Sequence, residues 1–435
     1  MPSAIRTVTE LEKQGVILVQ DGNHGEYRPR KNEFCDEGVA FIRAADLDNG
    51  NVLFESASKI DPTARARITK GIGKPGDVIL SHKGTVGKLA KAPDNCPSFV
   101  CSPQTTFWRS LNPDILDQTY LYVFLRSPVF TAQLNARAGE TDMAPYVSLT
   151  AQRSFVVTLP QIEEQRAIAR IIGRLDDKIE LNRRMNETLE AQARALFRDW
   201  FIDFGPVNAK MAGDTPYLAP DLWSLFPNHL GDDGAPEGWE VAPLDEIAEF
   251  LNGLALQKYP ASDGEDSLPV IKIAELRTGP TSKSNRASTD VPEKYVIDDG
   301  DFIFSWSGSL LAKFWTHGPG ALNQHLFKVT SDQFPPWVYS QWVWHHLAEF
   351  QLIAASKATT MGHIKRGHLK EAMCIVPSPD LLEELSAIME PIVERTLANE
   401  LESRTLAQTR DLLLPKLMSG EIRVGDWASE ELSAA

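Results

Sequence analysis

The chain has 435 residues, of which 43% are hydrophobic and 24% charged, so it has the composition of a globular protein and the length for two or three domains. It contains no apolar run of roughly 18 residues and no signal peptide, so we expect a cytoplasmic protein and neither a membrane span nor secretion. The net charge of −15 excludes a uniformly basic surface. A polyanion would therefore have to meet local basic patches or be held by a more basic partner.

Cysteine and histidine usage does not indicate a metal centre. The four cysteines fit a reducing compartment. Cys96 and Cys101 lack the paired Cys or His spacing of a zinc site, and His345 with His346 has no convincing acidic partner. We therefore predict no bound metal.

Residues 1–158 are predicted to form a first mixed domain. Short strands and then one helical stretch are predicted at Val16–Val19, Val39–Arg43, Asp77–Leu80, Thr105–Trp108 and Tyr120–Ala138. The loop Gly84–Leu89 contains Gly-Lys, but Leu89 stands where a Walker loop needs Ser or Thr to hold magnesium. The chain also lacks a methyltransferase's Asn/Asp-Pro-Pro-aromatic tetrad and its Gly-rich cofactor loop. We therefore predict no catalytic residues.

Residues 159–204 are predicted to form a long helix, because a row of core residues recurs at every seventh position and so lies along one helix face. The row consists of Ile168, Leu175, Asn182, Leu189 and Leu196. Residues 377–420 are predicted to form a second long helix, in which the row returns 217 residues later (168 to 385) as Leu385, Ile392, Asn399, Leu406 and Leu413. Since both rows carry Asn in third place, we infer a duplicated domain plus helix.

The remaining segments complete this duplication. Residues 205–235, rich in Pro, Gly and Asp, are predicted to be an extended linker with at most one short helix. Residues 236–376 are predicted to be the second mixed domain, and residues 421–435 a C-terminal tail. Pro391 is expected to kink or delay the second long helix.

The two long helices are predicted to pack antiparallel, because each needs an apolar partner of similar length. This pairing would bring Asn182 and Asn399 together near the middle, where a buried polar residue fixes the register. The predicted fold class is α+β, with two duplicated mixed domains separated by an antiparallel coiled coil of pseudo-two-fold symmetry. The alternative is a pair of unrelated amphipathic helices, each with a surface Asn.

The two globular segments resemble each other in their strands and differ in their loops. Gly76–Ser81 is similar to Gly300–Ser305, and each strand runs into a loop containing Ser, Gly and Lys. A repeated backbone with divergent loop tips is expected where one scaffold presents two different reading surfaces.

Six motifs then point to a family. They are Leu159-Pro160, Glu163–Ala169, Leu175–Ile179, Arg198–Phe201, Ala235–Trp239 and Leu414–Ile422. With these motifs the chain resembles the specificity subunits of type I restriction-modification systems over nearly its whole length. The second helix departs from the pattern, since Gln165-Arg166 corresponds to Leu382-Glu383.

The resemblance implies a non-catalytic subunit that binds double-stranded DNA with a bipartite target, each mixed domain being a target recognition domain for one half. The helices would act as a spacer and dock two methyltransferase subunits, which use S-adenosylmethionine, and the complex would recruit motor-nuclease subunits. No cofactor is expected on this chain itself.

Loops that read DNA present polar and basic side chains to base edges and phosphates. The candidates in the first domain are Lys83, Thr85, Lys88, Gln104, Arg137, Thr141 and Tyr146. Those in the second domain are Trp306, Ser307, Lys313, Asn323, Gln324, His325, Lys357, Thr360, His363, Lys365 and Arg366. Each could instead be a solvated loop residue.

Three other functions remain open at this point. One is a self-contained methyltransferase of unusual motif order, and another is a coiled-coil scaffold that never touches DNA. The third is a DNA-reading or scaffold subunit of another defence system.

Overall fold

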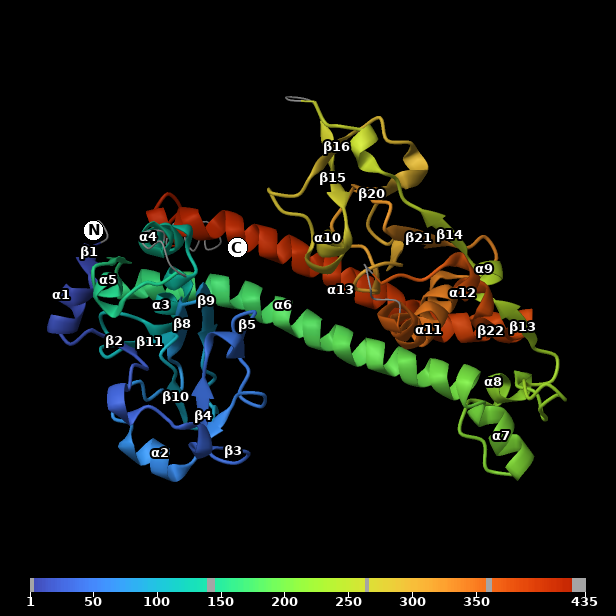
Figure 1. Cartoon of the computed structure of the whole chain (residues 1–435), viewed down its shortest axis with the longest axis horizontal. Helices are drawn as coiled ribbons and strands as arrows, with labels where there is room; N and C mark the ends of the chain where they lie inside the picture. Colours follow the sequence, from blue (N-terminus) through green and yellow to red (C-terminus); the bar gives the residue numbers. More distant parts are fainter. Residues whose placement is uncertain (1–3, 139–144, 263–265, 357–361, 425–435) are drawn as a thin grey trace, which may run out of the picture. The chain divides into compact units, whose positions relative to one another are not determined.

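The computed structural model describes residues 4–138, 145–262, 266–356 and 362–424 (Figure 1). The chain divides into two compact units. The first contains residues 1–177 and 407–435, and the second contains residues 178–406. Each unit thus takes in one mixed segment and a part of both long helices, so the domain boundaries expected from the sequence stay a prediction.

The first unit is built on two four-stranded sheets, with strand orders β2-β11-β8-β9 and β10-β4-β7-β3. The first sheet is antiparallel, and its strands are β2 (Ile17–Asp21), β8 (Val78–Lys83), β9 (Thr85–Lys91) and β11 (Thr105–Ser110). The second contains β3 (Phe34–Cys35), β4 (Val39–Ile42), β7 (Lys59–Ile60) and β10 (Phe99–Cys101). The four strands expected from the sequence are β2, β4, β8 and β11, which confirms their places.

Helices cover one face of the antiparallel sheet of this unit. The helical stretch expected as one piece is two helices, α3 (Gln118–Leu125) and α4 (Pro128–Ala138). The break falls at Pro128, whose ring disfavours helical geometry in the residue before it. Trp108, Tyr120 and Phe130 are fully buried in the core beneath these helices. The remaining elements are α1 (Val8–Lys13), β5 (Leu47–Asp48), β6 (Asn51–Val52), α2 (Pro62–Arg67) and α5 (Leu149–Arg153).

The second unit repeats this plan with sheets of order β14-β21-β18-β19 and β16-β15-β20-β17. The strands are β14 (Glu249–Asn252), β15 (Ser267–Ile271), β16 (Arg286–Ser288), β17 (Val296–Ile297), β18 (Phe302–Ser305), β19 (Ala312–Phe314), β20 (Gly320–Leu322) and β21 (Leu326–Thr330). Helix α11 (Pro336–Ser356) buries Trp337 and Trp342 in the core of the unit. Short helices are α9 (Leu244–Ile247), α10 (Ile273–Thr278) and α12 (Arg366–Glu371).

A two-stranded sheet precedes each long helix. In the first unit β1 (Ala4–Thr7) pairs antiparallel with β12 (Val156–Leu159), and in the second β13 (Glu240–Pro243) pairs with β22 (Met373–Val376). Because β12 and β22 run directly into the long helices, these pairs tie the start of each mixed segment to its helix.

The prediction of an extended linker with at most one short helix at residues 205–235 is wrong. The residues after the first long helix form a π-helical turn (Arg198–Ile202) and two short helices, α7 (Gly205–Ala212) and α8 (Pro220–Leu225). Val207, Leu222 and Phe226 are buried in the core of the second unit. Burial of these apolar side chains outweighs the local preference of Pro, Gly and Asp for extended chain.

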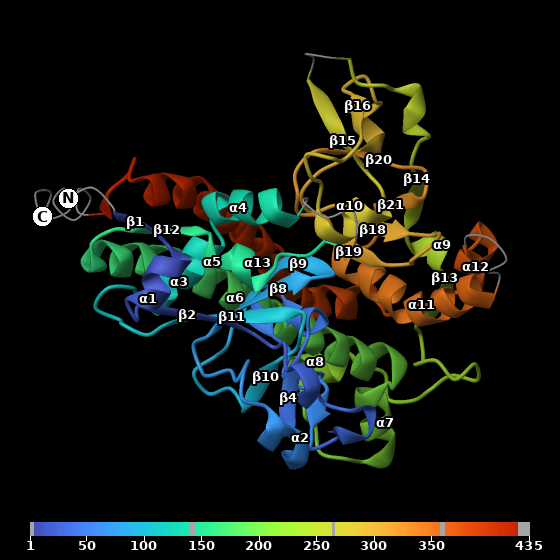
Figure 2. The same cartoon turned by 60° about the vertical axis from the view of Figure 1, so that its left-hand side comes forward.

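The long helices α6 (Ile162–Phe197) and α13 (Pro379–Ser419) pack against each other in opposite directions within both units (Figure 2). In the first unit Ile168 shares a core with Leu417, and in the second Asn182 bonds to Asn399. The ten heptad residues are all buried or half-buried. Since α13 runs through Pro391 without interruption, the expected delay of the second helix is wrong.

The buried core of the first turns of α13 explains this continuity. Leu381, Leu385 and Met389 are fully buried in the second unit, whereas Pro391 itself is exposed. Packing of these apolar residues keeps the helix continuous, although Pro391 cannot donate a backbone hydrogen bond to the preceding turn.

The two asparagines lie in the middle of the helix pair, as predicted. Asn182 Nδ2 is 3.3 Å from the Asn399 carbonyl oxygen and 2.8 Å from Glu402 Oε2. Asn399 Nδ2 donates to Asn186 Oδ1 at 2.8 Å. Asn186, which the heptad row did not contain, is therefore the third member of this polar layer.

Candidate nucleic-acid interface

Three loop segments meet at the end of β8 in the first unit. One is the end of β8. The turn Ser102–Gln104 before β11 and the segment Pro145–Val147 before α5 join it there. The backbone N–H of His82 donates to the Gln104 carbonyl at 2.9 Å, and the Val147 N–H donates to the His82 carbonyl at 2.9 Å. These bonds hold three segments distant in sequence in one surface.

The second unit contains the same three-segment arrangement. The N–H of Trp306 donates to the His325 carbonyl at 3.3 Å, and the N–H of Ile364 donates to the Trp306 carbonyl at 3.0 Å. The corresponding glycine contacts also agree, since Gly84 N–H donates to Pro145 at 3.0 Å and Gly308 N–H to Gly362 at 2.8 Å. His82 therefore corresponds to Trp306 and Gln104 to His325. We call each set of three hydrogen-bonded segments the frame of its unit.

A glycine lies beneath the frame in each unit. The N–H of Gly22 donates to the Thr105 carbonyl at 3.2 Å, and that of Gly253 to the Leu326 carbonyl at 3.0 Å. A Cβ would lie 1.9 Å from the Cys101 carbonyl oxygen at Gly22 and 2.3 Å from that of Asn323 at Gly253. No other residue fits this close approach. Asp21-Gly22 and Asn252-Gly253 were signals in the sequence that could have located the frame.

The first unit presents a lysine and a tyrosine on its frame. Lys83 and Thr85, beside the β8–β9 turn, and Gln104 are exposed. The Lys83 ammonium lies 5.8 Å from the ring centre of Tyr146, whose exposed fraction is 38%. Because the amine makes no ion pair among the described residues, it can serve a phosphate or a base edge.

The second unit presents an indole and two imidazoles instead. Trp306 is half-buried and donates its Nε1–H to Asn252 Oδ1 at 2.8 Å. The rings of His325 and His363 lie 5.9 Å and 6.2 Å from that of Trp306. Ser307 Oγ lies 3.0 Å from His325 Nδ1. Asn252, which sequence reasoning missed, thus orients the central aromatic residue of this surface.

Other candidates lie on or near the frame of the second unit with buried or engaged side chains. Ser307 and Asn323 are buried, and Asn323 Oδ1 accepts the His325 N–H at 3.3 Å. Arg366 donates to the Phe250 carbonyl at 3.0 Å and lies over the Phe327 ring. Ser307 and Asn323 support the surface from beneath, and whether any of the three meets DNA stays a prediction.

The remaining candidates lie apart or outside the described residues. Lys88 donates its Nζ–H to the Leu47 carbonyl at 3.0 Å and so is turned toward β5. Arg137 is exposed at the end of α4, Lys365 is exposed before α12, and Gln324 is half-buried beside His325. Thr141, Lys357 and Thr360 fall outside the described residues.

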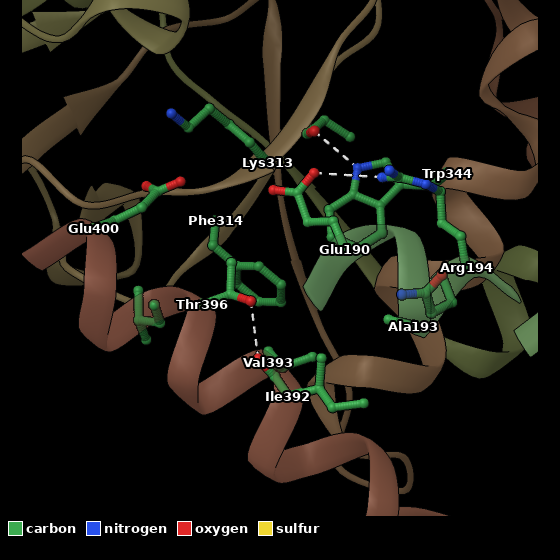
Figure 3. A pocket seen from close by; sticks show the side chains of 13 residues that line it. Glu190, Ala193, Arg194, Lys313, Phe314, Trp344, Ile392, Val393, Thr396 and Glu400 are labelled. Atoms are coloured by element: carbon green, nitrogen blue, oxygen red, sulfur yellow. Dashed lines mark hydrogen bonds and ion pairs between the residues drawn. The ribbon is translucent and has the colours of Figure 1, made fainter. Parts of the chain in front are cut away.

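Lys313 lies away from the frame, in a cavity of about 300 Å³ lined by β19, α6, α11 and α13 (Figure 3). Its neighbours there include Phe314, Trp344 and Glu400. The cavity wall also holds an ion pair between Arg194 and Glu190 at 3.4 Å. A role of Lys313 in reading DNA stays a prediction.

The outer face of α6 is charged. Arg184 Nε donates to Glu180 Oε1 at 2.8 Å, and the Arg184 side chain is 71% exposed. Its neighbour Arg183 also pairs with Glu180, and these contacts lower the pKa of Glu180 to about 2. A solvated, charged helix face can steer the approach of a partner with complementary charge.

Neither a metal cluster nor a membrane span is found in the part of the chain that the structure describes. Within residues 4–138, 145–262, 266–356 and 362–424 no group of three or more His, Cys, Asp or Glu side chains could hold a metal ion. No described helix is long and apolar enough to cross a bilayer.

Comparison with known families gives a match over most of the chain. The model of the type I restriction modification DNA specificity domain matches twice, at residues 19–191 and 236–406. The HindI specificity subunit of Haemophilus influenzae is 26% identical, over 88% of this chain and 94% of its own length. The MjaIX specificity subunit of Methanocaldococcus jannaschii is 24% identical, over 90% of this chain and 88% of its own length.

A solved structure has the same fold. The S subunit of a type I restriction-modification system from M. genitalium aligns with a TM-score of 0.54 and 15% identity, over 95% of this chain and 96% of that one. Together with the twofold family match, this likeness confirms the predicted fold class of two repeated mixed domains with long helices.

Proposed function

The chain belongs to the family of type I restriction modification DNA specificity domains, and on that premise we propose that it is the subunit that selects the DNA target of a type I restriction-modification complex. Each mixed domain reads one half of a bipartite sequence in double-stranded DNA. The observation that carries this proposal is the backbone frame that occurs twice with different side chains. One frame presents Lys83, Gln104 and Tyr146, and the other presents Trp306, His325 and His363.

The frame suits direct readout because its residues come from strand ends and loops that project from a sheet. Amide, hydroxyl, imidazole and ammonium groups are the side chains that recognise base edges and phosphates. Since corresponding positions carry different groups, the two domains recognise different sequences. Lys83 of the first domain also supplies a local positive charge for a phosphate on a chain whose net charge is negative.

The two long helices act as the spacer between the recognition domains and as the docking surface for two methyltransferase subunits. A helix of 36 residues such as α6 is about 54 Å long, more than the roughly 34 Å of one DNA turn. The charged outer face of α6 supports a docking role. Motor-nuclease subunits then join the assembled complex.

The chain itself performs no catalysis. Its sequence lacks a methyltransferase tetrad and a cofactor loop, so S-adenosylmethionine is bound by the partner methyltransferase subunits. The protein works in the cytoplasm, where it meets chromosomal and incoming DNA.

DNA selection tests the proposal. The complex of this chain with its methyltransferase subunit is incubated with random-sequence duplexes, and the bound DNA is sequenced. We expect two short specific halves at a fixed spacing. Enrichment of one continuous motif, or of none, would contradict a bipartite reader.

A second measurement separates the reader from an enzyme. Calorimetric titration of the purified chain alone with S-adenosylmethionine should give no heat of binding, whereas the complex should bind it. Binding by the chain alone would favour a self-contained methyltransferase.

A further inference from the structure

Gln104 and His325 occupy the same position in the two units. Each is the last residue of the turn before a central strand, β11 or β21, and each carbonyl accepts from the end of the neighbouring strand. The backbone N–H of each also bonds to a side chain two residues earlier. Gln104 N–H donates to Ser102 Oγ at 3.2 Å, and His325 N–H donates to Asn323 Oδ1 at 3.3 Å.

The anchoring of both turns continues into the second sheet. Ser102 N–H donates to the Ile42 carbonyl at 2.8 Å, and Asn323 N–H donates to the Ile271 carbonyl at 3.2 Å. Since both Ser102 and Asn323 are buried, the turn is fixed from beneath in each unit. A rigid turn holds its outermost side chain in one place, which is what discrimination between bases requires.

The side chain of Gln104 is exposed and uncommitted. Within the described part of the chain its amide makes no side-chain hydrogen bond, although the amide carries two donors and an acceptor with two lone pairs. It lies on the same surface as Lys83 and Tyr146, which the backbone bridge between these two residues holds side by side. An amide presented in this way suits a base edge, and the adjacent ammonium suits a phosphate.

The imidazole of His325 is presented differently. Ser307, which is 3% exposed, places its Oγ 3.0 Å from Nδ1, and the Gln324 amide lies 3.4 Å from Nε2. A neutral imidazole has one donor and one acceptor nitrogen, and a partner on one nitrogen sets the role of the other. The Ser307 hydroxyl, which can donate or accept, therefore occupies Nδ1 and constrains the ring plane of His325.

We propose that Gln104 and His325 each read one base pair of their half-site, and that Ser307 is a positioning residue that sets which ring nitrogen of His325 faces the base. This inference rests on the proposed function of the two domains. It goes further by assigning one equivalent reading position to each domain and a mechanism of support to the second.

Methylome mapping of single variants tests the assignment. Gln104→Ala, His325→Ala and Ser307→Ala are each co-expressed with the methyltransferase subunit, and methylated adenines are mapped across the host DNA. Gln104→Ala should lose discrimination at one base pair of the first half, by roughly 10- to 100-fold. His325→Ala should do the same in the second half only. Ser307→Ala should relax the same base pair as His325→Ala.

Matched controls remove the same chemical groups elsewhere. Gln14 and His229 are exposed residues away from the frame, and Ser309 is exposed two residues after Ser307. Gln14→Ala, His229→Ala and Ser309→Ala should each leave both halves of the motif unchanged. Co-purification of the methyltransferase subunit with every variant verifies that the chain is folded.

The outcomes separate the two levels of the argument. If the wild-type chain directs methylation to a split motif, and Gln104→Ala and His325→Ala leave that motif intact, the reading position is overturned and the proposed function stands. A wild-type chain that directs no split methylation overturns both. If Ser307→Ala leaves the base pair relaxed by His325→Ala unchanged, the positioning role of Ser307 is overturned.

Discussion

The imidazole of His82 lies directly behind the frame of the first unit, with 1% of its surface exposed. Its Nδ1 is 3.0 Å from the Val147 carbonyl oxygen, so Nδ1 carries the proton and donates. Burial lowers the pKa of His82 below its usual value of 6.5, although the hydrogen bond to Val147 acts in the opposite direction. The folded chain thus holds a neutral ring where the end of β8 meets the segment Pro145–Val147.

A pH dependence of stability follows from this lowered pKa. The unfolded chain takes up a proton at His82 below pH 6.5, whereas the folded chain resists protonation, so stability is full above 6.5 and falls as pH drops below it. His82→Asn keeps a donor for Val147 and cannot titrate. Between about pH 7.5 and about pH 5.5 the variant should lose less unfolding free energy than the wild type, by at most about 1.4 kcal/mol.

Urea unfolding at the two pH values checks this expectation. His24, whose pKa is also lowered by burial, is unchanged in the variant and contributes equally to both chains. An identical acid-induced loss in the variant and the wild type would show that His82 is not a source of the pH dependence.

At the residue scale, the sequence predicted which loops come together better than it predicted which side chains are exposed. Lys83, Gln104 and His325 do lie on the frame: Lys83 is on the loop after the strand that recurs in both segments, and Gln104 and His325 end the turns before β11 and β21. The burial of Ser307 and the engagement of Lys88 depend on contacts with distant segments, Ser307 with His325 and Lys88 with Leu47. No local pattern encodes such contacts.

At the scale of elements, the polar layer of the helix pair contains two residues that the sequence predicted, Asn182 and Asn399, and one that it did not, Asn186. The heptad row placed Asn182 and Asn399 near each other because the seven-residue period and the antiparallel arrangement fix their heights. Asn186 is off this row, since it lies four residues after Asn182 on the neighbouring stripe of α6. Its contact with Asn399 became visible only with the pairing of the helices.

Substitutions in this layer test its role in stability and register. Asn399→Leu leaves Asn186 Oδ1 without its donor in a site where Asn186 is 8% exposed, and should reduce the unfolding free energy by about 1–3 kcal/mol. The double variant Asn186→Leu with Asn399→Leu replaces both partners by apolar groups and should recover much of this loss. A double-mutant cycle from denaturant unfolding measures the coupling. Strictly additive losses would contradict a specific amide pair.

The charged face of α6 is the predicted docking surface for the methyltransferase subunit. Arg184→Glu reverses a side chain that is 71% exposed, so the change alters the surface and leaves the helix core intact. We expect binding of the methyltransferase subunit to weaken by about three- to tenfold, as measured by titration of the partner on immobilised chain. Lys283→Glu makes the same charge change in an exposed loop of the second unit and should have no effect. Equal affinities of the two variants would count against docking on this face.

The predicted linker shows why local composition was insufficient at the element scale. Pro, Gly and Asp in residues 205–235 favour turns, yet Val207, Leu222 and Phe226 bury apolar surface in the core of the second unit. Two short helices result where at most one was expected. The long helices were predictable because their seven-residue pattern extends over whole elements.

At the scale of the whole molecule, duplication explains why two mixed domains share one backbone plan and carry different loop side chains. The family model matches twice, and the two units share the strand order of the antiparallel sheet, a strand pair before each long helix and a loop frame. Function then lies in the side chains that differ between the copies. Because the net charge is −15, we expect affinity for DNA to depend also on the proposed partner subunits.

The measurement that tests this account most directly is a domain exchange read by methylome sequencing. The chain is co-expressed with its methyltransferase subunit, and residues 1–158 are replaced by the corresponding segment of a relative with a different target. We predict a split methylated motif for the original chain, and for the exchanged chain a motif in which one half has changed while the other half and the gap stay the same. Methylation that is absent, continuous, or unaffected by the exchange would contradict the proposal that each duplicated domain reads its own half of the target.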